Sequence, residues 1–431
     1  MKLLSSLTQI ALLILFVTAS VFGQGTDPQL PFVRGVRIYG GDVETSLPMI
    51  IRGDRNERGE FITANDFITI VFDVNEISPP RLQIKFRHCN KNWQIDETPI
   101  VRDDFYSTTR TLAYETSPPG VRHYTFRFKN QFPGANNPFV RFLYSGNWVF
   151  DITKEFDESV VYASGRFFVV DAGVRTMLNI RNDYWTDFPT PLDRVHELIT
   201  DVKVPDSMYT DYVTTIDVFQ NRRLFHPHRV STWERAYNTR VEGVGMPEKR
   251  FTYENIIPGN AYRVYDFRSP GLYPAGLPVN KLGNPDFTRF RFGSDDPHHF
   301  GAALLTHGNG WDDDYMQVKF ALAFPRDDSI SIFLAGAFNN WDPMLEDKLI
   351  WDEKENQYIV WKMLLRGSYD YQYVMGEWDM KAGYVVEQDW TTIEGSAWET
   401  RNHYWCLVYY DDPAFGGIDR IVGFAEVESG R

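Results

Sequence analysis

Short runs of alternating apolar and polar residues dominate the first half of the sequence. The clearest runs from Leu82 to His88, with apolar side chains at even positions and polar ones at odd positions until His88. A period of two is typical of a β-strand that has one face in solvent. Similar runs cover residues 67–74, 123–129, 148–152 and 166–170, with clusters of Pro, Gly and Asn between them. Repeated short strands separated by turn residues predict a β-sandwich, which we end near Asp171.

Two further sets of strands follow. Residues 212–219 form one run. In a second run, His196, Leu198, Val202 and Val204 all occupy even-numbered positions. Part of this second run would also suit a short helix after Pro191, but Pro205 and the Val-rich surroundings favour a strand. Residues 272–310 predict an irregular connection with an edge strand. Beyond Trp311, strands at 329–334 and 367–374 flank a turn at 336–341.

The expected fold is therefore all-β, with tandem immunoglobulin-like or early-set β-sandwich domains. We place an N-terminal sandwich at 24–171, a second sandwich with an irregular connection at 172–310, and a C-terminal early-set-like sandwich at 311–431. The 12 Trp, 23 Tyr and 32 Phe suit this class, because aromatic rings pack well on a pleated, half-buried surface.

The N-terminus has the features of a secretory signal peptide, which we assign to residues 1–23. Lys2 precedes the apolar run 10–17, and small residues follow. The run is shorter than the roughly 20 apolar residues that cross a bilayer, so we expect an exported, soluble mature chain. No Cys follows the run, which argues against a lipoprotein. The net charge of −14 argues against nucleic acid as a partner, since phosphate binding requires a basic surface.

Neither a disulfide nor a metal site is expected. Cys89 and Cys406 lie more than three hundred positions apart, so we predict two small buried side chains. The run 312–314 of three Asp residues lacks the spacing of a calcium loop and predicts a solvated domain junction. The histidines 226, 228, 298 and 299 have no carboxylate or Cys at ligand spacing, so we expect no metal and no cofactor.

A catalytic site is not expected either. His88 shares a strand face with Leu82 and Phe86, so its ring should enter the core and hold a structural hydrogen bond. Cys89 points to the opposite face and cannot pair with His88 as nucleophile and base. Acids are plentiful, yet nothing marks a pair for glycoside hydrolysis, and the sequence has no nucleophile elbow, phosphate loop or dinucleotide fingerprint. We therefore predict that the protein is not an enzyme.

Three strings carry a resemblance to a known family. They are His88-Cys89-Asn90-Lys91-Asn92-Trp93, Tyr144-Ser145-Gly146-Asn147-Trp148, and residues 259–269, which include Asp266 and Arg268. Together with later strings they resemble the plug proteins of the type IX secretion system from Val36 to about Val427, with Trp148 where that family has Tyr. The resemblance implies a periplasmic protein, peripherally associated with a large outer-membrane β-barrel translocon, that docks under the barrel and closes its inner mouth. These motif residues would serve the fold or the interface.

The C-terminal part also resembles early-set sandwiches that include glycogen- and starch-binding modules. Trp341 and Trp378 occupy the places where aromatic rings of those modules stack on sugars. Gln372 replaces the usual Lys, and Met375 replaces the Asp before the Gly. These departures favour packing or protein contact for both Trp residues. An exported glycan-binding protein is the alternative function, and it requires both rings exposed on one face.

Overall fold

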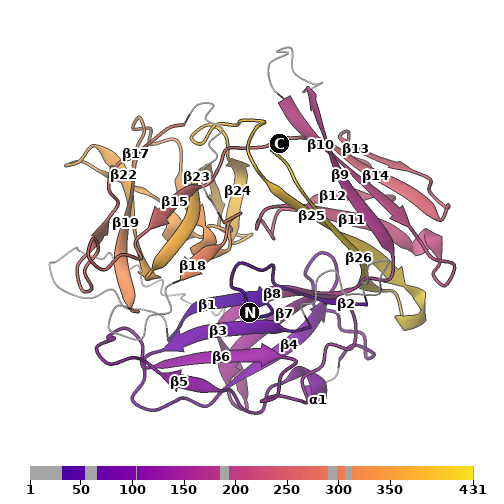
Figure 1. The fold of residues 1–431 in the computed structure, drawn as a ribbon, viewed down its shortest axis with the longest axis horizontal. Coiled ribbons are helices and arrows are strands. Elements are labelled where there is room, and N and C mark those ends of the chain that lie inside the picture. The colour runs from indigo at the N-terminus through magenta and orange to yellow at the C-terminus, as the bar shows by residue number, and fades with distance from the viewer. Residues whose placement is uncertain are drawn as a thin grey trace, which may run out of the picture. The chain divides into compact units, whose positions relative to one another are not determined.

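The computed structural model describes residues 32–53, 66–102, 104–184, 194–289, 299–305 and 313–430. The predicted signal peptide lies outside these residues, as do Asp312 and His298. The described part is an all-β fold with six sheets, which confirms the predicted class (Figure 1). The immunoglobulin-like or early-set type of the sandwiches stays a prediction. Within the described ranges, no helix has the length and apolar character needed to cross a bilayer.

The first pair of sheets contains most of residues 33–171. One sheet has the order β1 (Val33–Gly40), β3 (Ile68–Val74), β6 (Phe126–Phe132) and β5 (Tyr114–Thr116). The other has the order β2 (Met49–Arg52), β8 (Asp157–Asp171), β7 (Gly146–Lys154) and β4 (Leu82–Cys89), and the short helix α1 (Asp104–Ser107) precedes β5. Inward-facing side chains of both sheets, such as Phe72, Phe86, Phe128 and Phe150, share one core. The strands predicted from alternation at 67–74, 82–88, 148–152 and 166–170 are confirmed.

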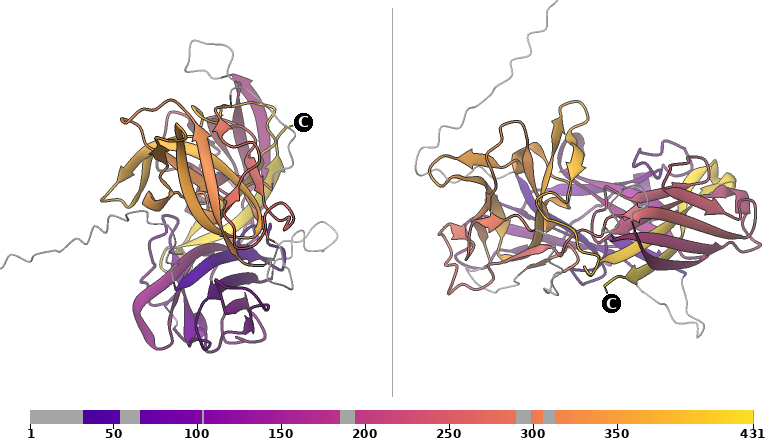
Figure 2. Two further views of the ribbon diagram at one scale, coloured as in Figure 1. Left: turned by 90° about the vertical axis from the view of Figure 1, so that its left-hand side faces the viewer. Right: turned by 90° about the horizontal axis from the view of Figure 1, so that it is seen from above.

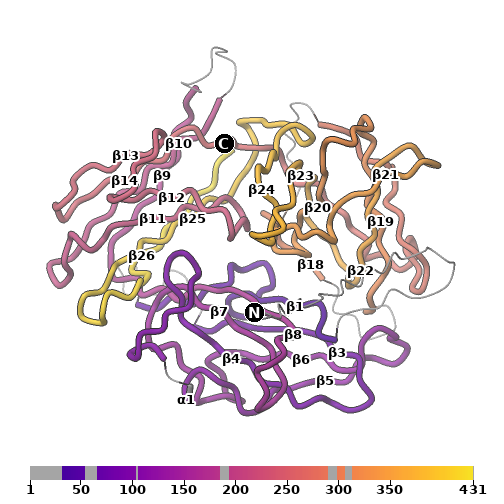
Figure 3. Tube along the Cα trace, turned by 180° about the vertical axis from the view of Figure 1, so that it is seen from behind, coloured from indigo at the N-terminus to yellow at the C-terminus, as the bar shows by residue number. Residues whose placement is uncertain are grey.

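The second pair of sheets combines two distant parts of the chain. One sheet has the order β13 (Thr239–Glu242), β14 (Glu248–Ile256), β10 (Arg194–Lys203) and β9 (Arg175–Tyr184). The other has the order β12 (His228–Ser231), β11 (Val213–Gln220), β25 (His403–Asp412) and β26 (Ile418–Glu428). In Figures 2 and 3 the yellow β25 and β26 accompany the magenta strands of this pair. The strand predicted over His196–Val204 is confirmed, because β10 pairs on both sides with β9 and β14.

The third pair of sheets lies between β14 and β25 in the sequence. In one sheet, β23 (Gly367–Asp379) pairs with β15 (Arg263–Asp266), β18 (Ala303–Leu305), β20 (Ile332–Gly336) and β24 (Tyr384–Asp389). The other contains β16 (Val279–Asn280), β19 (Tyr315–Ala323), β22 (Gln357–Leu365) and β21 (Ile350–Asp352), with β17 (Asp286–Phe287) also on β19. Tyr265, Phe320, Tyr371 and Tyr373 belong to the common core. The alternating tyrosines of 367–374 thus form a strand as predicted.

The sheets do not follow the predicted division between residues 310 and 311. Strands β25 and β26 belong with β11, and β15 to β18 belong with β19 and β23, so the third pair is inserted into the second. The reason is the apolar face of β25, on which Tyr404, Cys406 and Val408 enter the core of the second pair. The domain boundaries at 171/172 and 310/311 remain a prediction about folding units.

Two predicted strands start later than expected, because polar side chains hold their first residues elsewhere. Residues 329–331 precede β20, since Ser329 donates from its backbone N–H and its hydroxyl to the Asp327 carboxylate at 2.9 and 2.6 Å. This is the local side-chain bonding that competes with a strand ladder. Similarly, His123 donates its backbone N–H to Asp314 over 3.2 Å, and the strand predicted from 123 begins at Phe126.

An apolar cluster joins the first and second pairs of sheets. Phe168 and Val170 of β8 pack with Phe219 of β11 and Trp405 of β25, and the last two rings stack at 4.1 Å with a 14° interplanar angle. The inner-face neighbours Phe167 and Val169 belong to the core of the first pair. The run Phe167-Phe168-Val169-Val170 therefore lacks polar residues because both of its faces are covered.

Candidate functional site: polar junctions between the sheet pairs

The two N-terminal motif strings lie side by side. They meet because β4 and β7 are antiparallel neighbours, with His88 opposite Trp148 and Cys89 opposite Asn147. The His88 ring is buried, its Nε2 lies 3.1 Å from the Ser145 carbonyl oxygen, and it packs edge-on against Trp148. Burial lowers the pKa of His88, so the imidazole is neutral at pH 7 and donates from Nε2. His88 thus lies in the core with a hydrogen bond to the backbone, and its structural role stays a prediction.

Gly146 makes this close approach possible. Its φ is +141°, and a Cβ at this position would lie 2.3 Å from His88 Nε2 and 2.8 Å from the Asp419 carbonyl oxygen. Asn90 shapes the neighbouring turn, since its side-chain oxygen accepts the backbone N–H groups of Asn92 and Gln94. Both motifs therefore fix backbone geometry.

Replacing Gly146 by Ala should lower the free energy of unfolding by about 2 to 3 kcal/mol, since the new methyl group displaces the His88 ring. Gly53 is the matched control: its φ is also positive, at +83°, but no atom lies within 4 Å of its Cβ position. Gly53→Ala should cost about 1 kcal/mol, from backbone strain alone. Urea unfolding of both variants measures the difference, and equal losses would show that Gly146 is needed only for its φ.

The turn after β4 forms the first junction, between the first and second pairs. The backbone N–H of Lys91 donates to Asp419 over 2.8 Å, and its ammonium donates to Asp419 over 2.7 Å and to Asp411 over 3.2 Å. Burial on its own would raise the pKa of Asp419, but hydrogen bonds from Asp411 and Lys91 bring it below its ordinary value. Asn147 belongs to the same junction, because its side-chain oxygen accepts the Tyr409 hydroxyl over 2.9 Å.

Arg229 of β12 completes the first junction. It donates two hydrogen bonds to Asp217, over 2.6 and 2.7 Å, and one to the Lys91 carbonyl over 2.7 Å. A fourth hydrogen bond joins it to the Asn92 side chain. A buried bidentate pair of this kind fixes orientation as well as distance.

The second junction, between the first and third pairs, is built on the acidic run. Arg127 of β6 pairs with Asp73 at 2.8 Å and with Asp313 at 2.9 Å, and the Tyr315 hydroxyl donates to Asp73 over 3.0 Å. Burial alone would lower the pKa of Arg127, but the hydrogen bonds and charge of Asp73, with the charge of Asp313, raise it. The prediction of a solvated junction was wrong for the described Asp313 and Asp314: both are buried, since cations and backbone N–H groups of the first pair cover them.

The third junction, between the second and third pairs, centres on Asn221. Its side-chain amide donates to the Tyr262 hydroxyl over 3.0 Å and to the Asn402 side chain over 2.9 Å. Next to it, Arg223 donates to Gln372 over 2.9 Å, and Gln372 donates to the Asn260 carbonyl over 3.1 Å. Gln372, which replaces the usual Lys of the sugar-binding modules, is therefore a buried residue whose hydrogen bonds connect the second and third pairs.

The other predicted site residues lie apart from these junctions. Asp266 and Arg268 form an exposed pair at the end of β15, with donor-acceptor distances of 2.9 and 2.6 Å. Trp93 is half-buried against Phe168. Trp341 is only 1% exposed, stacks on Tyr262 at 4.1 Å and donates to the Gly301 carbonyl over 2.8 Å. The exposure that sugar stacking requires is not met by Trp341, and sugar binding itself stays untested.

Cys89 and Cys406 are both buried and free, as predicted. Burial raises the pKa of Cys89 to about 11 and that of Cys406 to about 12, so both thiols are protonated at neutral pH. Within the described ranges, no group of three or more His, Cys, Asp or Glu side chains has the arrangement of a metal site.

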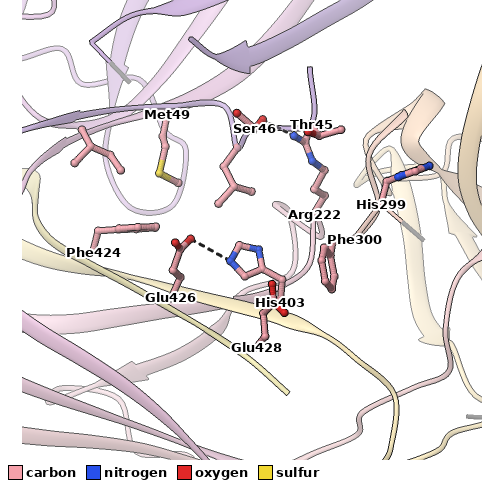
Figure 4. A pocket seen from close by; sticks show the side chains of 12 residues that line it. Thr45, Ser46, Met49, Arg222, His299, Phe300, His403, Phe424, Glu426 and Glu428 are labelled. Carbon is pink, nitrogen blue, oxygen red and sulfur yellow. Dashed lines mark hydrogen bonds and ion pairs between the residues drawn. The ribbon is translucent and has the colours of Figure 1, made fainter. Parts of the chain in front are cut away.

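A hollow of about 510 Å³ tests the enzyme alternative (Figure 4). His403 Nε2 lies 3.1 Å from Glu426 on its wall, and Arg222 points toward the backbone of Ser46. A His–Glu pair resembles part of a catalytic triad, which also needs a nucleophile bonded to the His. In the part of the chain that the structure describes, no hydrogen bond joins His403 to the hydroxyls of Thr45 or Ser46, which also line the hollow.

Several junction residues were not anticipated: Asp73, Arg127, Asp217, Arg229, Asp411 and Asp419. A usable signal existed for two of them. Asp73 and Asp217 each stand between apolar neighbours within a strand, in Ile-Val-Phe-Asp-Val and Thr-Ile-Asp-Val-Phe. A carboxylate in such a place must find a cation or donors, which predicts a buried pair without naming its partner.

Comparison with known proteins adds two findings. Residues 51–171 match the family of the type 9 secretion system plug protein 1st domain. The fold is similar to that of a hypothetical protein from Parabacteroides merdae, with a TM-score of 0.71 and 20% sequence identity over 92% of this chain and 97% of that chain. At this identity the likeness is one of fold alone. No protein of curated function matches the sequence. The family resemblance is thus confirmed for residues 51–171 and stays a prediction for the rest of the chain.

Proposed function

We propose that this chain, with its type 9 secretion system plug protein first domain at residues 51–171, is a periplasmic plug of that secretion system. It binds the large outer-membrane translocon and closes the periplasmic end, without chemistry of its own. The family match over residues 51–171 is the observation that carries the proposal. A channel wide enough for folded or partly folded cargo would leak small solutes, so its resting state needs a stopper.

The three junctions support this role because they favour a stiff body. Hinge motion between sheet pairs would require breaking ion pairs that cross between them, such as Arg127–Asp313 and Lys91–Asp419. Leaving one such charge buried and unpaired costs about 3 to 5 kcal/mol. The Phe168–Trp405 cluster adds apolar contact at the first junction. A stopper that keeps its shape can cover an opening with a fixed surface.

The contact surface should contain exposed aromatic residues and a polar rim. Release on arrival of cargo requires a moderate, partly polar interface, whereas permanent complexes are larger and more apolar. Trp233 and Tyr237 are the strongest candidates: both lie on the connection between β12 and β13 and are 76% and 82% exposed. Trp and Tyr dominate binding energy in many interfaces because they bury much area with few rotatable bonds.

Affinity purification from the native envelope tests the proposal. The full chain, tagged and expressed at its natural level, should recover a very large outer-membrane β-barrel protein after mild solubilisation. Recovery of the tagged chain with no such protein, from an envelope shown to contain the translocon, would count decisively against a plug.

The same experiment tests the contact surface. Trp233→Ala combined with Tyr237→Ala should lower recovery of the barrel protein by about tenfold or more, which corresponds to about 1.4 kcal/mol of binding. Phe156→Ala is the matched control, since Phe156 is an equally isolated aromatic with 90% exposure at the turn between β7 and β8. If Phe156→Ala abolishes recovery and the double variant does not, the barrel contacts the first pair of sheets instead.

A further inference from the structure

A second hollow, of about 580 Å³, lies where residues of all three sheet pairs meet. Its wall includes Trp93 and Arg166 from the first pair, Arg222 and Phe225 from the connection after β11, and Trp341 and Asp342 from the segment after β20. A volume of this size suits a small organic ligand. The proposed plug function uses none of these side chains.

Arg166 is the most unusual group in this hollow. Its guanidinium carbon lies 4.8 Å from the centre of the Trp93 ring and 4.4 Å from that of Phe225. Among the described residues, no ion pair joins Arg166 to a carboxylate, and Asp342, which also lines the hollow, acts on Arg166 through its charge. Burial lowers the pKa of Arg166, and the charge of Asp342 offsets this only in part. Aromatic contacts to the flat faces of a guanidinium leave its N–H donors, which lie in its plane, available for hydrogen bonds.

A second cation faces the same space. Arg222 donates to the carbonyl oxygen of Ser46, and burial lowers its pKa to about 10, an effect that the charge of Asp370 only partly offsets. Apolar side chains including Val36, Ile38 and Leu224 form other parts of the wall. A site with cations beside apolar side chains is complementary to a ligand that carries an anionic group on an apolar chain.

The backbone around the hollow is strained. Trp93, Asn340 and Trp341 have positive φ angles of 62°, 53° and 62°. Asn adopts this conformation readily, but a bulky Trp does so at a cost of about 1 to 3 kcal/mol, and such strain concentrates at functional sites. The two strained Trp residues belong to different sheet pairs, and both line this hollow.

We propose that this hollow binds a monocarboxylate carried on an apolar body, and that Arg166 takes the carboxylate. The planar fork of a guanidinium matches a carboxylate with two parallel hydrogen bonds. The apolar body would lie against Val36, Ile38 and Leu224. Two sources share this chemistry: a small amphiphile such as a fatty acid, and the free C-terminal carboxylate of an apolar peptide. The inference does not rest on the plug function, and either can fail alone.

Titration calorimetry on the full mature chain tests the proposal with four probes. Octanoate and N-acetyl-leucyl-leucine carry the carboxylate, while octan-1-ol and N-acetyl-leucyl-leucine amide are their neutral counterparts. At least one carboxylate should bind about tenfold or more tightly than its neutral counterpart. The tighter of the two acids identifies the source. Absence of binding by both acids at millimolar concentration, or equal binding of acids and neutral probes, would overturn the proposal.

A pair of variants assigns the effect to Arg166. Arg166→Gln should weaken carboxylate binding by about tenfold or more and leave binding of the neutral probe unchanged. Arg194→Gln is the matched control, because Arg194 also lies over an aromatic ring, that of Trp398 at 4.4 Å, but does not line this hollow. It should leave carboxylate binding unchanged. Unchanged carboxylate binding in a folded Arg166→Gln variant would remove Arg166 from the site.

Discussion

Replacing Arg127 by Met is expected to lower the free energy of unfolding by about 3 to 5 kcal/mol, because it leaves buried charges without their cation. Asp73 and Asp313 are both buried, and Arg127 is the ion-pair partner of each in the described structure. Met has a similar length and is apolar, so the lost volume contributes little. Chemical denaturation at pH 7 measures the change through the urea midpoint and slope.

Two further variants distinguish the buried charges from the loss of an arginine in general. Arg250→Met breaks a bidentate pair with Asp201, at 2.7 and 3.1 Å, between the inner strands β14 and β10 on a solvent-exposed face of the second pair. Its midpoint should stay nearly unchanged, since solvent already screens that pair. Adding Asp313→Asn to Arg127→Met should recover part of the loss, because one unpaired charge disappears. A loss for Arg127→Met no greater than that for Arg250→Met would show that the second junction does not hold the sheet pairs together.

The strands were predictable because their signal is local. From Leu82 to His88 the alternation of side chains assigns the strand and the face that is buried, and it places His88 in the core. The strand at 166–170 was predicted together with the alternating runs, although Phe167-Phe168-Val169-Val170 is uniformly apolar, as is typical of a run that is covered on both faces. The motif string after His88 forms a turn at the end of β4, where the Asn90 side chain accepts a backbone N–H group.

The junctions were not predictable, because their partners are far apart in the chain. Lys91 meets Asp419, and Arg127 meets Asp313, across separations of 328 and 186 residues. No periodicity within a window of ten residues reports such a pair. The run of three Asp residues at 312–314 looks solvated for the same reason: its neighbours in sequence offer no cation, and the cations come from another pair of sheets. The position of β25 and β26 beside β11 likewise depends on an apolar face that suits several partners.

Asp370 should make the stability of the protein fall as the pH rises from about 4 to about 7. This carboxyl is buried on β23, where one oxygen accepts the backbone N–H groups of His299 and Gly301, each over 2.8 Å. Within the described structure, the other oxygen has no hydrogen-bond partner. Burial raises the pKa of Asp370 to about 7, although the two N–H donors and the charge of Arg222 act in the opposite direction.

The direction of the pH effect follows from this raised pKa. Between pH 4 and pH 7 the folded state holds a proton on Asp370 that the unfolded state has lost, so stability decreases with rising pH. The stabilisation is complete below the unfolded pKa near 3.8 and is lost as the pH passes the folded value near 7. A shift of this size corresponds to up to about 4 kcal/mol. Asp370→Asn keeps an oxygen for the two N–H donors and removes the charge, so its advantage over the natural chain should grow from pH 4 to pH 7 and then stay constant.

Unfolding curves at several pH values between 4 and 8 measure this difference, and Asp379→Asn provides the matched control. Asp379 also accepts two backbone N–H groups, those of Lys381 and Ala382. Its carboxylate is surrounded by solvent, so burial opposes these hydrogen bonds little and they lower its pKa. Asp379→Asn should therefore show no growing advantage over the natural chain between pH 4 and pH 7. The same flat difference for Asp370→Asn would mean that the buried carboxyl ionises as readily in the folded chain as in the unfolded one.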